Sequence, residues 1–217
     1  MSSLDRFPRA PATPAGREAF VEQEFHAGRD LRSRISKAPS VTAAEVADFW
    51  RQAGPSMWFA RDADFDRRFR EGFLDAHEAA ARGDLGRWMT TPEGALALLV
   101  LLDQFPRNAF RGTPRMYATD AAARRIAAAA IDAGHDAAMP PGLRTFFYLP
   151  FAHSEELADQ ERSVALCGPL GPPDSINSAR HRDIVKRFGR FPHRNPILGR
   201  TMTADEQEFL DRGGYAG

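Results

Sequence analysis

Residues 91–108 read TPEGALALLVLLDQFPRN, a stretch that decides the fold class because it predicts a helix that is apolar nearly all round. Thr91 is a favoured N-cap residue, and Pro92 suits the first helical position. The leucines and the valine that follow leave no polar face, which is typical of a helix at the centre of a core. We expect Pro106 to end this helix, because proline removes a helical hydrogen bond.

Helix signals continue on both sides of this stretch, and no strand-like alternation interrupts them. Capping boxes are expected where Thr42 precedes Glu45 and where Thr203 precedes Glu206. Further helices are expected over residues 64–82, 119–133, 141 onward, 154–167 and 174–188. The sequence therefore predicts an all-α domain of antiparallel helical hairpins, and the spacing of helix pairs is compatible with a degenerate helical-repeat solenoid.

The domain organisation follows from how the apolar residues are distributed over the 217 residues. Residues 1–16 are rich in small residues and proline, and we predict a flexible leader there. Residues 17–40 carry dense charge and a thin apolar stripe, which predicts a mostly exposed N-terminal extension helix. Residues 41–217 are expected to form a single all-helical domain.

The composition excludes several classes of protein. Lys and Arg total 29 and Asp and Glu total 29, so no global field attracts a polyanion, and we expect no nucleic-acid partner. The longest apolar run, residues 95–102, is too short to span a membrane, and the start lacks a signal-peptide core. A single cysteine, Cys167, fits a reducing compartment, so we expect a cytoplasmic protein that does not bind membranes.

The first polar segment closes the apolar helix and contains Asp103, Gln104, Arg107 and Asn108. An aspartate in the last turn of a helix opposes the helix dipole and needs a nearby cation. A structural salt bridge that closes the turn would meet this need, and so would a site in which the acid faces a ligand.

The second segment, residues 149–164, places polar groups on a predicted helix. His153 and Gln160 share a stripe with Leu157 and Val164 at helical spacing, so both are expected to face inward. Glu156 follows His153 by one turn, close enough for a hydrogen bond or for joint binding of a metal ion. A histidine buried in the core with its hydrogen bonds satisfied is the alternative interpretation.

The third segment, residues 177–200, concentrates seven Arg and Lys residues around one acid, Asp183. His181 shares a face with apolar residues and is expected to point inward. The loop residues Arg190, His193, Arg194 and Asn195 offer donors that suit carboxylate or phosphate oxygens. Alternatively, the arginines neutralise buried acids, the candidates being Asp103, Glu155, Glu156 and Asp159.

Three long strings in these segments carry a resemblance to a known family: LLDQFPRNAFRGTPRMYATD (101–120), LPFAHSEELADQERSV (149–164) and HRDIVKRFGRFPHRNPILGR (181–200). Together with the upstream DFW and WF and the late TADEQEFL, they resemble the bacterial domain-of-unknown-function family 924 over about residues 42–215. The resemblance implies an all-helical, tetratricopeptide-like fold and no established activity. The family's polar signature corresponds to Asp103, Gln104, Arg107, Asn108, Asp120, His153, Glu155, Asp159, Gln160, His181, Arg190, Arg194, Asn195 and Arg200.

Three functions fit this pattern, and the first is a small-molecule site where the polar segments meet. There His153 or His181 would act as general acid or base, Glu156 or Asp103 would orient it, and a small anionic molecule would be held by the remaining candidates. These ligand-binding candidates are Gln104, Arg107, Asn108, Gln160, Arg190, Arg194, Asn195 and Arg200.

The second function is a helical-repeat module that binds a protein partner or an acidic peptide. The third, ranked lowest, is a metal site built from His153, Glu156 and His181. No phosphate loop, nucleophile elbow, zincin helix or calcium loop is present in the sequence, which names no cofactor.

Overall fold

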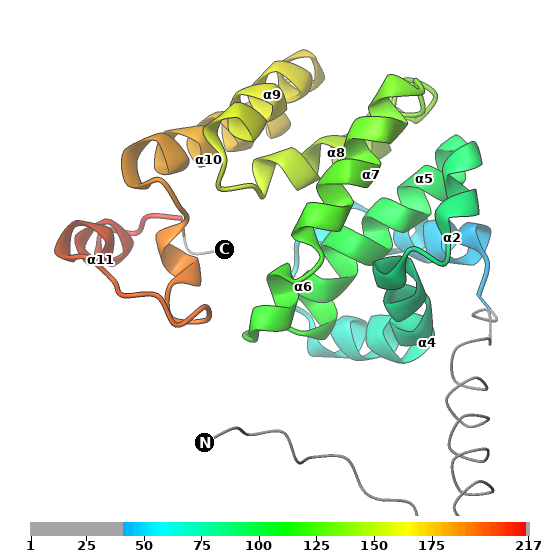
Figure 1. Cartoon of the computed structure of the whole chain (residues 1–217), viewed down its shortest axis with the longest axis horizontal. Helices are drawn as coiled ribbons and strands as arrows, with labels where there is room; N and C mark the ends of the chain where they lie inside the picture. Colours follow the sequence, from blue (N-terminus) through cyan, green and yellow to red (C-terminus); the bar gives the residue numbers. More distant parts are fainter. Residues whose placement is uncertain (1–40, 216–217) are drawn as a thin grey trace, which may run out of the picture. The chain divides into compact units, whose positions relative to one another are not determined.

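The computed structural model describes residues 41–215, and this part of the chain is all-α (Figure 1). The predictions for residues 1–16 and 17–40 fall outside the described residues. The α-helices are α2 (Ala43–Ala53), α3 (Pro55–Trp58), α4 (Ala63–Arg82), α5 (Pro92–Leu99), α6 (Phe105–Ala109), α7 (Asp120–Asp132), α8 (Pro141–Ala152), α9 (Leu157–Cys167), α10 (Asp174–Phe188) and α11 (Ala204–Asp211). Short 3-10 turns are η1 (Gly86–Thr90), η3 (Pro114–Tyr117), η4 (Gly168–Leu170) and η5 (Pro192–Arg194), and η2 (Val100–Gln104) is a π-helical turn.

The helix α5 lies at the centre of the core, as its sequence predicts. It packs against α2, α7 and α8, and its residues from Gly94 to Leu99 are all buried. Gly94 is required there, because a Cβ at this position would lie 2.0 Å from the carbonyl oxygen of Trp88. The aromatic side chains of Trp50, Phe69 and Phe105 belong to the same core and are fully buried.

The expected helix ends are confirmed at several positions. Both capping boxes form, with Thr42 and Thr203 as the N-cap residues. Gly83 and Gly189 adopt left-handed conformations directly after α4 and α10. These ends are local features, and local features can be predicted from the sequence.

The prediction that Pro106 ends the central helix is wrong. The chain passes from α5 through the π turn η2 into α6 and stays helical to Ala109. In the π turn, the Phe105 N–H donates to the Val100 carbonyl, five residues back. Pro106 has no N–H and cannot donate a helical hydrogen bond. The wider turn accommodates it, because the carbonyl left without a backbone donor is bound by a side chain instead.

Two side chains form hydrogen bonds to carbonyl groups that the π turn leaves without a backbone donor. The Thr119 hydroxyl donates to the Leu102 carbonyl at 2.6 Å. The His77 Nδ1 lies 2.9 Å from the Leu101 carbonyl oxygen. A buried carbonyl without a partner is costly, so these contacts stabilise the irregular turn.

The prediction that one helix covers residues 154–167 is wrong in its first turn, because α8 ends at Ala152 and α9 begins at Leu157. Leu157 is exposed, and the buried face of α9 consists of Gln160, Ser163 and Cys167. The shared stripe expected for His153, Leu157, Gln160 and Val164 therefore does not form.

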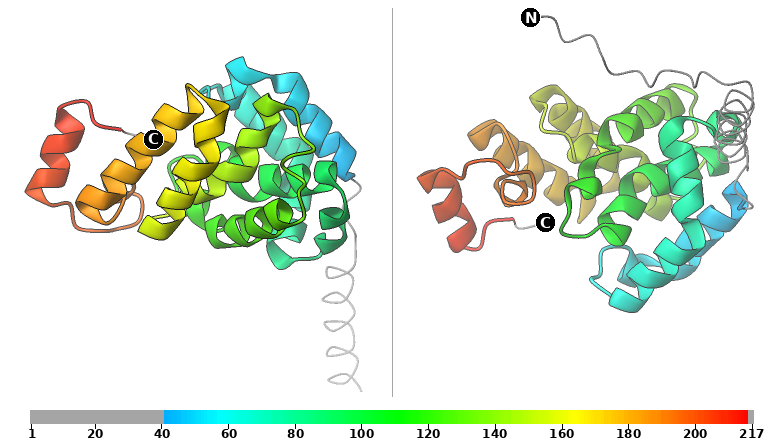
Figure 2. Two further views of the ribbon diagram at one scale, coloured as in Figure 1. Left: turned by 90° about the horizontal axis from the view of Figure 1, so that it is seen from above. Right: turned by 60° about the horizontal axis from the view of Figure 1, so that its bottom comes forward.

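Downstream of α8, α9 packs against both α8 and α10, and α11 lies at the end of the described unit away from α2 (Figures 1 and 2). Ile184, Val185 and Phe191 form an apolar cluster separate from the main core, with Phe188 and Phe209 packed against it. None of the helices within residues 41–215 combines the length and apolarity needed to cross a membrane. A tetratricopeptide-like repeat arrangement stays a prediction.

Candidate functional site

Asp103 and His153, fifty residues apart, form a hydrogen-bonded pair. Asp103 lies in the π turn, and His153 directly follows α8. His153 Nδ1 lies 2.8 Å from Asp103 Oδ1, and the aspartate side chain is 1% exposed. Gln104 Nε2 donates to the other carboxylate oxygen at 2.6 Å. The sequence left open whether Glu156 or Asp103 contacts His153. In the structure, Asp103 makes this contact.

Arg107, one turn after Asp103, connects this pair to α7. Its guanidinium lies 3.3 Å from Asp103 Oδ1 and donates to the Asp103 carbonyl at 2.7 Å. It also donates two hydrogen bonds to the Asp120 carboxylate, at 2.9 and 3.2 Å. Such bidentate contacts fix the orientation of both side chains.

Arg194, which lies in η5, connects the arginine-rich segment to the cluster around His153. It donates to the His153 carbonyl at 2.9 Å and lies 3.6 Å from Asp120 Oδ2. Its guanidinium stacks over the rings of Tyr117 and Phe191, 4.5 and 4.7 Å from their centroids. All three polar segments are therefore represented in one cluster around His153.

The pKa values of the pair indicate an ionised aspartate and a neutral imidazole. Burial acts to raise the pKa of Asp103, but the charge of Arg107 and the contact with His153 outweigh it and lower the pKa to about 2. Burial lowers the pKa of His153, and the nearby Arg107 lowers it further. An ionised Asp103 is an acceptor only, so it selects the tautomer with the proton on His153 Nδ1.

Two further histidines, His181 and His193, lie on the C-terminal side of this cluster. Their rings contact the ring of Tyr215, with centroids 4.6 and 5.2 Å apart. Burial lowers the pKa of His181 to about 3 and that of His193 to about 4, and the charge of Arg194 lowers both. Both imidazoles are therefore neutral at neutral pH and lie in a positive field.

Several buried polar atoms in this region have no hydrogen-bond partner within residues 41–215. They are Nδ1 of His181, Nδ1 of His193, Nε of Arg194, Oδ1 of Asn195 and Nε of Arg200. Buried polar atoms normally have partners, so a group of unpartnered atoms distinguishes this region from the rest of the described core.

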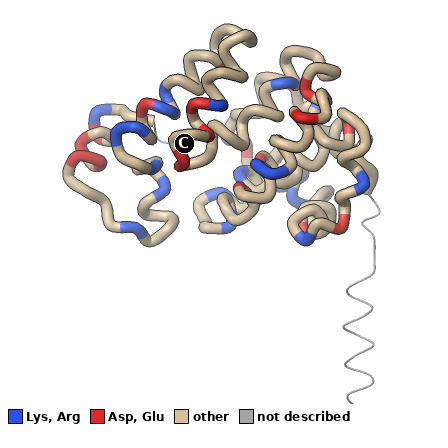
Figure 3. Tube along the Cα trace, turned by 45° about the horizontal axis from the view of Figure 1, so that its top comes forward, with Lys and Arg blue, Asp and Glu red and all other residues tan. Residues whose placement is uncertain are grey.

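Basic and acidic residues are both spread along the described part of the chain (Figure 3). Two of the predicted ligand-binding arginines form ion pairs with acids. Arg190 donates to both oxygens of Glu206 at 2.6 and 2.8 Å, and Arg200 pairs with Glu155 at 2.7 and 2.9 Å. Because Glu155 also accepts from the Phe191 N–H at 2.9 Å, these contacts hold the loop in place. Neutralisation of acids by arginines therefore accounts for Arg190 and Arg200.

The remaining candidates have structural partners. Asn108 donates to the Gln104 carbonyl at 2.9 Å and accepts from Arg111. Gln160 Nε2 donates to carbonyls of Ala152 and Ser154 at the end of α8, at 2.8 and 2.6 Å.

The other acids expected near His153 lie elsewhere. Glu156 is exposed and precedes α9 instead of sharing a helix with His153. Asp159 pairs with Arg124 at 3.3 Å. No set of three His, Cys, Asp or Glu side chains in the described part of the chain is arranged to hold a metal ion. The metal site imagined for His153, Glu156 and His181 is therefore not formed by these residues.

Sequence reasoning missed the aromatic residues of this region, Tyr117 and Tyr215. Tyr117 lies in the 3-10 turn η3, and Tyr215 lies beyond the last helix. Neither belongs to a periodic pattern, so no helical signal marks them. The only signal was proximity in sequence: Tyr117 is within the first long string and lies three residues before Asp120.

Comparison with known proteins gives two matches. Residues 46–214 match the model of a family described as "Bacterial protein of unknown function (DUF924)". The fold is similar to that of a protein of unknown function, ATU0120, from Agrobacterium tumefaciens, with a TM-score of 0.78 and 54% sequence identity. That match covers 79% of this chain and 97% of the other. The chain matches no curated protein.

Proposed function

Because this chain belongs to the bacterial family of unknown function DUF924, we propose a function from the site itself: the protein binds a small anionic molecule beside His153. His153, oriented by Asp103, then accepts a proton from that molecule. This proposal makes His153 the general base, Asp103 the orienting residue and Arg194 the anion-binding residue. The single cysteine supports a cytoplasmic location.

The contact between Asp103 Oδ1 and His153 Nδ1 at 2.8 Å is the observation that carries the proposal. The aspartate holds the proton on Nδ1, which leaves the lone pair of Nε2 available. A neutral imidazole fixed by a buried carboxylate is the arrangement that general-base histidines use. The lowered pKa of His153 keeps this nitrogen unprotonated at neutral pH.

The field around the histidines supports an anionic ligand. Formal charges nearly cancel, since Asp103 and Asp120 oppose Arg107 and Arg194. Burial is the main cause of the lowered pKa values of His153, His181 and His193, and at least one of these arginines lowers each pKa further. A positive field over neutral imidazoles disfavours protons and favours a negatively charged group.

Thermal denaturation with added anions tests the proposal. The probes are inorganic phosphate, pyrophosphate, acetate and citrate, each titrated against the wild type. A ligand at one hundred times its Kd adds about 2.7 kcal/mol, which corresponds to a rise of roughly 5 to 10 °C in Tm for a domain of this size. We expect at least one of these anions to raise Tm.

Two arginine variants separate binding from folding. Arg194→Ala should abolish the anion-dependent rise in Tm, measured against the ligand-free variant. Arg190→Ala also loses an arginine–carboxylate pair, with Glu206, but should keep the rise. An anion effect of equal size in Arg194→Ala would contradict the proposal. An acidic peptide that raises Tm where no small anion does would favour a binding module instead.

A further inference from the structure

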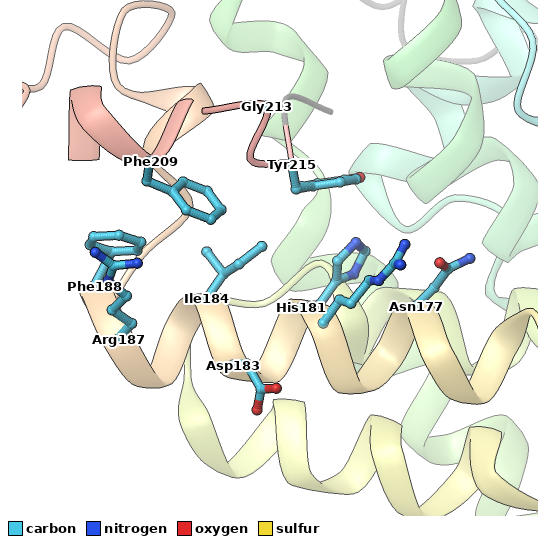
Figure 4. A pocket seen from close by; sticks show the side chains of 10 residues that line it. Asn177, His181, Asp183, Ile184, Arg187, Phe188, Phe209, Gly213 and Tyr215 are labelled. Atoms are coloured by element: carbon cyan, nitrogen blue, oxygen red, sulfur yellow. The ribbon is translucent and has the colours of Figure 1, made fainter. Parts of the chain in front are cut away.

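A groove of about 510 Å³ runs between α10 on one side and α11 with the segment that follows it on the other (Figure 4). Its lining residues are Asn177, Arg180, His181, Asp183, Ile184, Arg187, Phe188, Phe209, Gly213 and Tyr215. Its volume lies within the range of small-molecule sites. The groove shares His181 with the region around the cluster, but neither Asp103 nor His153 lines it, so it requires an explanation of its own.

One stripe of α10 forms the floor of the groove. Asn177, His181, Ile184 and Phe188 follow one another at helical spacing along a single face. Eleven residues of helix extend about 16 Å, so the floor is long enough for an extended chain. Asp183 points away from this floor in Figure 4 and pairs with Arg182 at 2.7 Å.

The two ends of the groove differ in chemistry. At one end Phe188 and Phe209 face each other, with ring centroids 5.2 Å apart, and Ile184 lies beside them. This end can bury hydrocarbon against the rings, and the Arg187 guanidinium lies at its border, 4.6 Å from the Phe188 centroid. At the other end His181 lies below Tyr215, with ring centroids 4.6 Å apart. This end is polar, so the groove suits a molecule with a polar head and an apolar tail.

His181 supplies a hydrogen-bond acceptor at the polar end. Its side chain is buried, with 7% of the residue exposed, and its Nδ1 has no partner within the described residues. Burial and the positive charge of Arg194 lower the pKa of the same ring to about 3, so the imidazole is neutral at neutral pH. A neutral imidazole carries its proton on one ring nitrogen and an acceptor lone pair on the other. The groove therefore has an acceptor that an N–H or O–H of a ligand can satisfy.

Arg180 supplies positive charge next to this acceptor. It lines the groove one residue before His181 and is exposed. Among residues 41–215, none of the carboxylates forms an ion pair with Arg180, whereas Arg182 is paired with Asp183. A free guanidinium suits a carboxylate, which it can bind through two hydrogen bonds.

We propose that this groove binds an N-acyl amino acid. The acyl chain lies over Ile184, Phe188 and Phe209, the amide N–H donates to the neutral imidazole of His181, and the carboxylate binds Arg180. Each of the three parts of the ligand matches one feature of the groove. Binding here does not depend on proton transfer at His153, so the inference stands apart from the proposed function.

Isothermal titration calorimetry of the full chain with three probes tests the ligand class. N-octanoylglycine has all three groups, N-octanoylsarcosine lacks the amide N–H, and N-acetylglycine lacks the long chain. We expect N-octanoylglycine to bind, and each of the other two to bind at least tenfold more weakly. Equal affinity for the glycine and sarcosine compounds would overturn the assignment to His181, and no binding of N-octanoylglycine would overturn the proposal.

Three variants locate the site. Arg180→Glu reverses an exposed charge in the groove and should weaken N-octanoylglycine binding at least tenfold. Lys186→Glu makes the same change on the same helix at an exposed position outside the groove lining, and should leave binding unchanged. Equal affinities of the two variants would contradict the groove site. The anion-dependent rise in Tm is measured separately from N-octanoylglycine binding, so failure of the proposed function and failure of this inference are distinguishable.

Discussion

Asp103 is the residue on which the buried polar cluster depends most. It is fully buried and contacts Arg107, His153 and Gln104. We expect Asp103→Asn to lower the free energy of unfolding by about 3 kcal/mol or more, because removing one charge leaves its buried partner uncompensated. Urea unfolding monitored by circular dichroism measures this change.

Asp183→Asn is the matched control for this prediction. Asp183 also pairs with an arginine, Arg182, at 2.7 Å, but its side chain is 64% exposed. Exposed ion pairs contribute little, so we expect a loss below about 1 kcal/mol. A loss of similar size in both variants would show that the contacts of Asp103 are no stronger than those of a surface pair.

The neutral imidazoles of His181 and His193 make stability depend on pH. Their folded-state pKa values are about 3 and about 4, below the ordinary value of 6.5. Between pH 6.5 and 4 the unfolded chain therefore binds protons that the folded chain does not. Their stabilising effect is fully present above pH 6.5 and decreases as the pH falls toward the folded-state values.

We expect each of these histidines to account for a loss of about 1.5 kcal/mol between pH 6.5 and pH 5, since one pKa unit corresponds to about 1.4 kcal/mol and the unfolded histidine is half protonated at pH 6.5. The free energy of unfolding, measured by urea titration across this range, gives the slope. His193→Gln should show a smaller slope than the wild type. An unchanged slope in this variant would mean that His193 is protonated in the folded state.

At the scale of single elements, the π turn η2 depends on a side chain from outside its own helix. The Thr119 hydroxyl donates to the Leu102 carbonyl, to which Pro106 cannot donate because it has no N–H. We expect Thr119→Val to lower the free energy of unfolding by about 1 to 3 kcal/mol, because the buried carbonyl loses its donor. The loss should be smaller in a Pro106→Ala background, where a backbone N–H is restored.

Thr113→Val provides the comparison. Its hydroxyl donates to the Phe110 carbonyl at 2.8 Å, but Thr113 is exposed and water can replace the bond. We expect little change in the free energy of unfolding. If the two threonine variants have the same stability, the Leu102 carbonyl does not need Thr119.

The elements show what the sequence could and could not predict. The capping boxes at Thr42 and Thr203 and the end of α10 at Gly189 depend on neighbouring residues, and their prediction is confirmed. The passage of the helix through Pro106 depends on Thr119, which is distant in sequence. The break between α8 and α9 likewise depends on Gln160, whose amide binds the carbonyls of the interrupted backbone.

The same distinction applies to the candidate site. The three polar segments that the sequence identified contribute Asp103, His153 and Arg194 to one cluster. The partner of His153 was not decided by sequence, because helical spacing favoured Glu156, whereas the contact with Asp103 is made across the fold. Which arginines remain available could not be predicted either, since Glu206 and Glu155 reach Arg190 and Arg200 through tertiary contacts.

For the whole molecule, the two apolar clusters predict unequal stability. The large core surrounds α5, whereas the second cluster has only Ile184, Val185 and Phe191 as its buried members. We expect Phe191→Ala to accelerate amide hydrogen exchange mainly after residue 188, because this small cluster can open without the main core. Leu99→Ala should instead lower global stability by roughly 2 to 5 kcal/mol and accelerate exchange throughout.

Hydrogen exchange measured by mass spectrometry follows both variants in the same peptides. Acceleration of α5 peptides in Phe191→Ala to the same extent as the C-terminal peptides would show that the described unit opens as a whole. A near-neutral effect of Leu99→Ala would contradict the central position of α5.

The π turn also sets the rotational phase between the two halves of the central helix. An α-helix advances by about 100° per residue, and a π turn accommodates one residue more than an α turn does. If the same residues formed a regular α-helix throughout, the faces of α5 and α6 would turn by about that angle relative to each other. With α5 fixed in the core, Arg107 would then rotate away from Asp120. The π turn therefore sets the rotation between α5 and α6, so that α5 faces the apolar core while Arg107 on α6 faces the polar cluster.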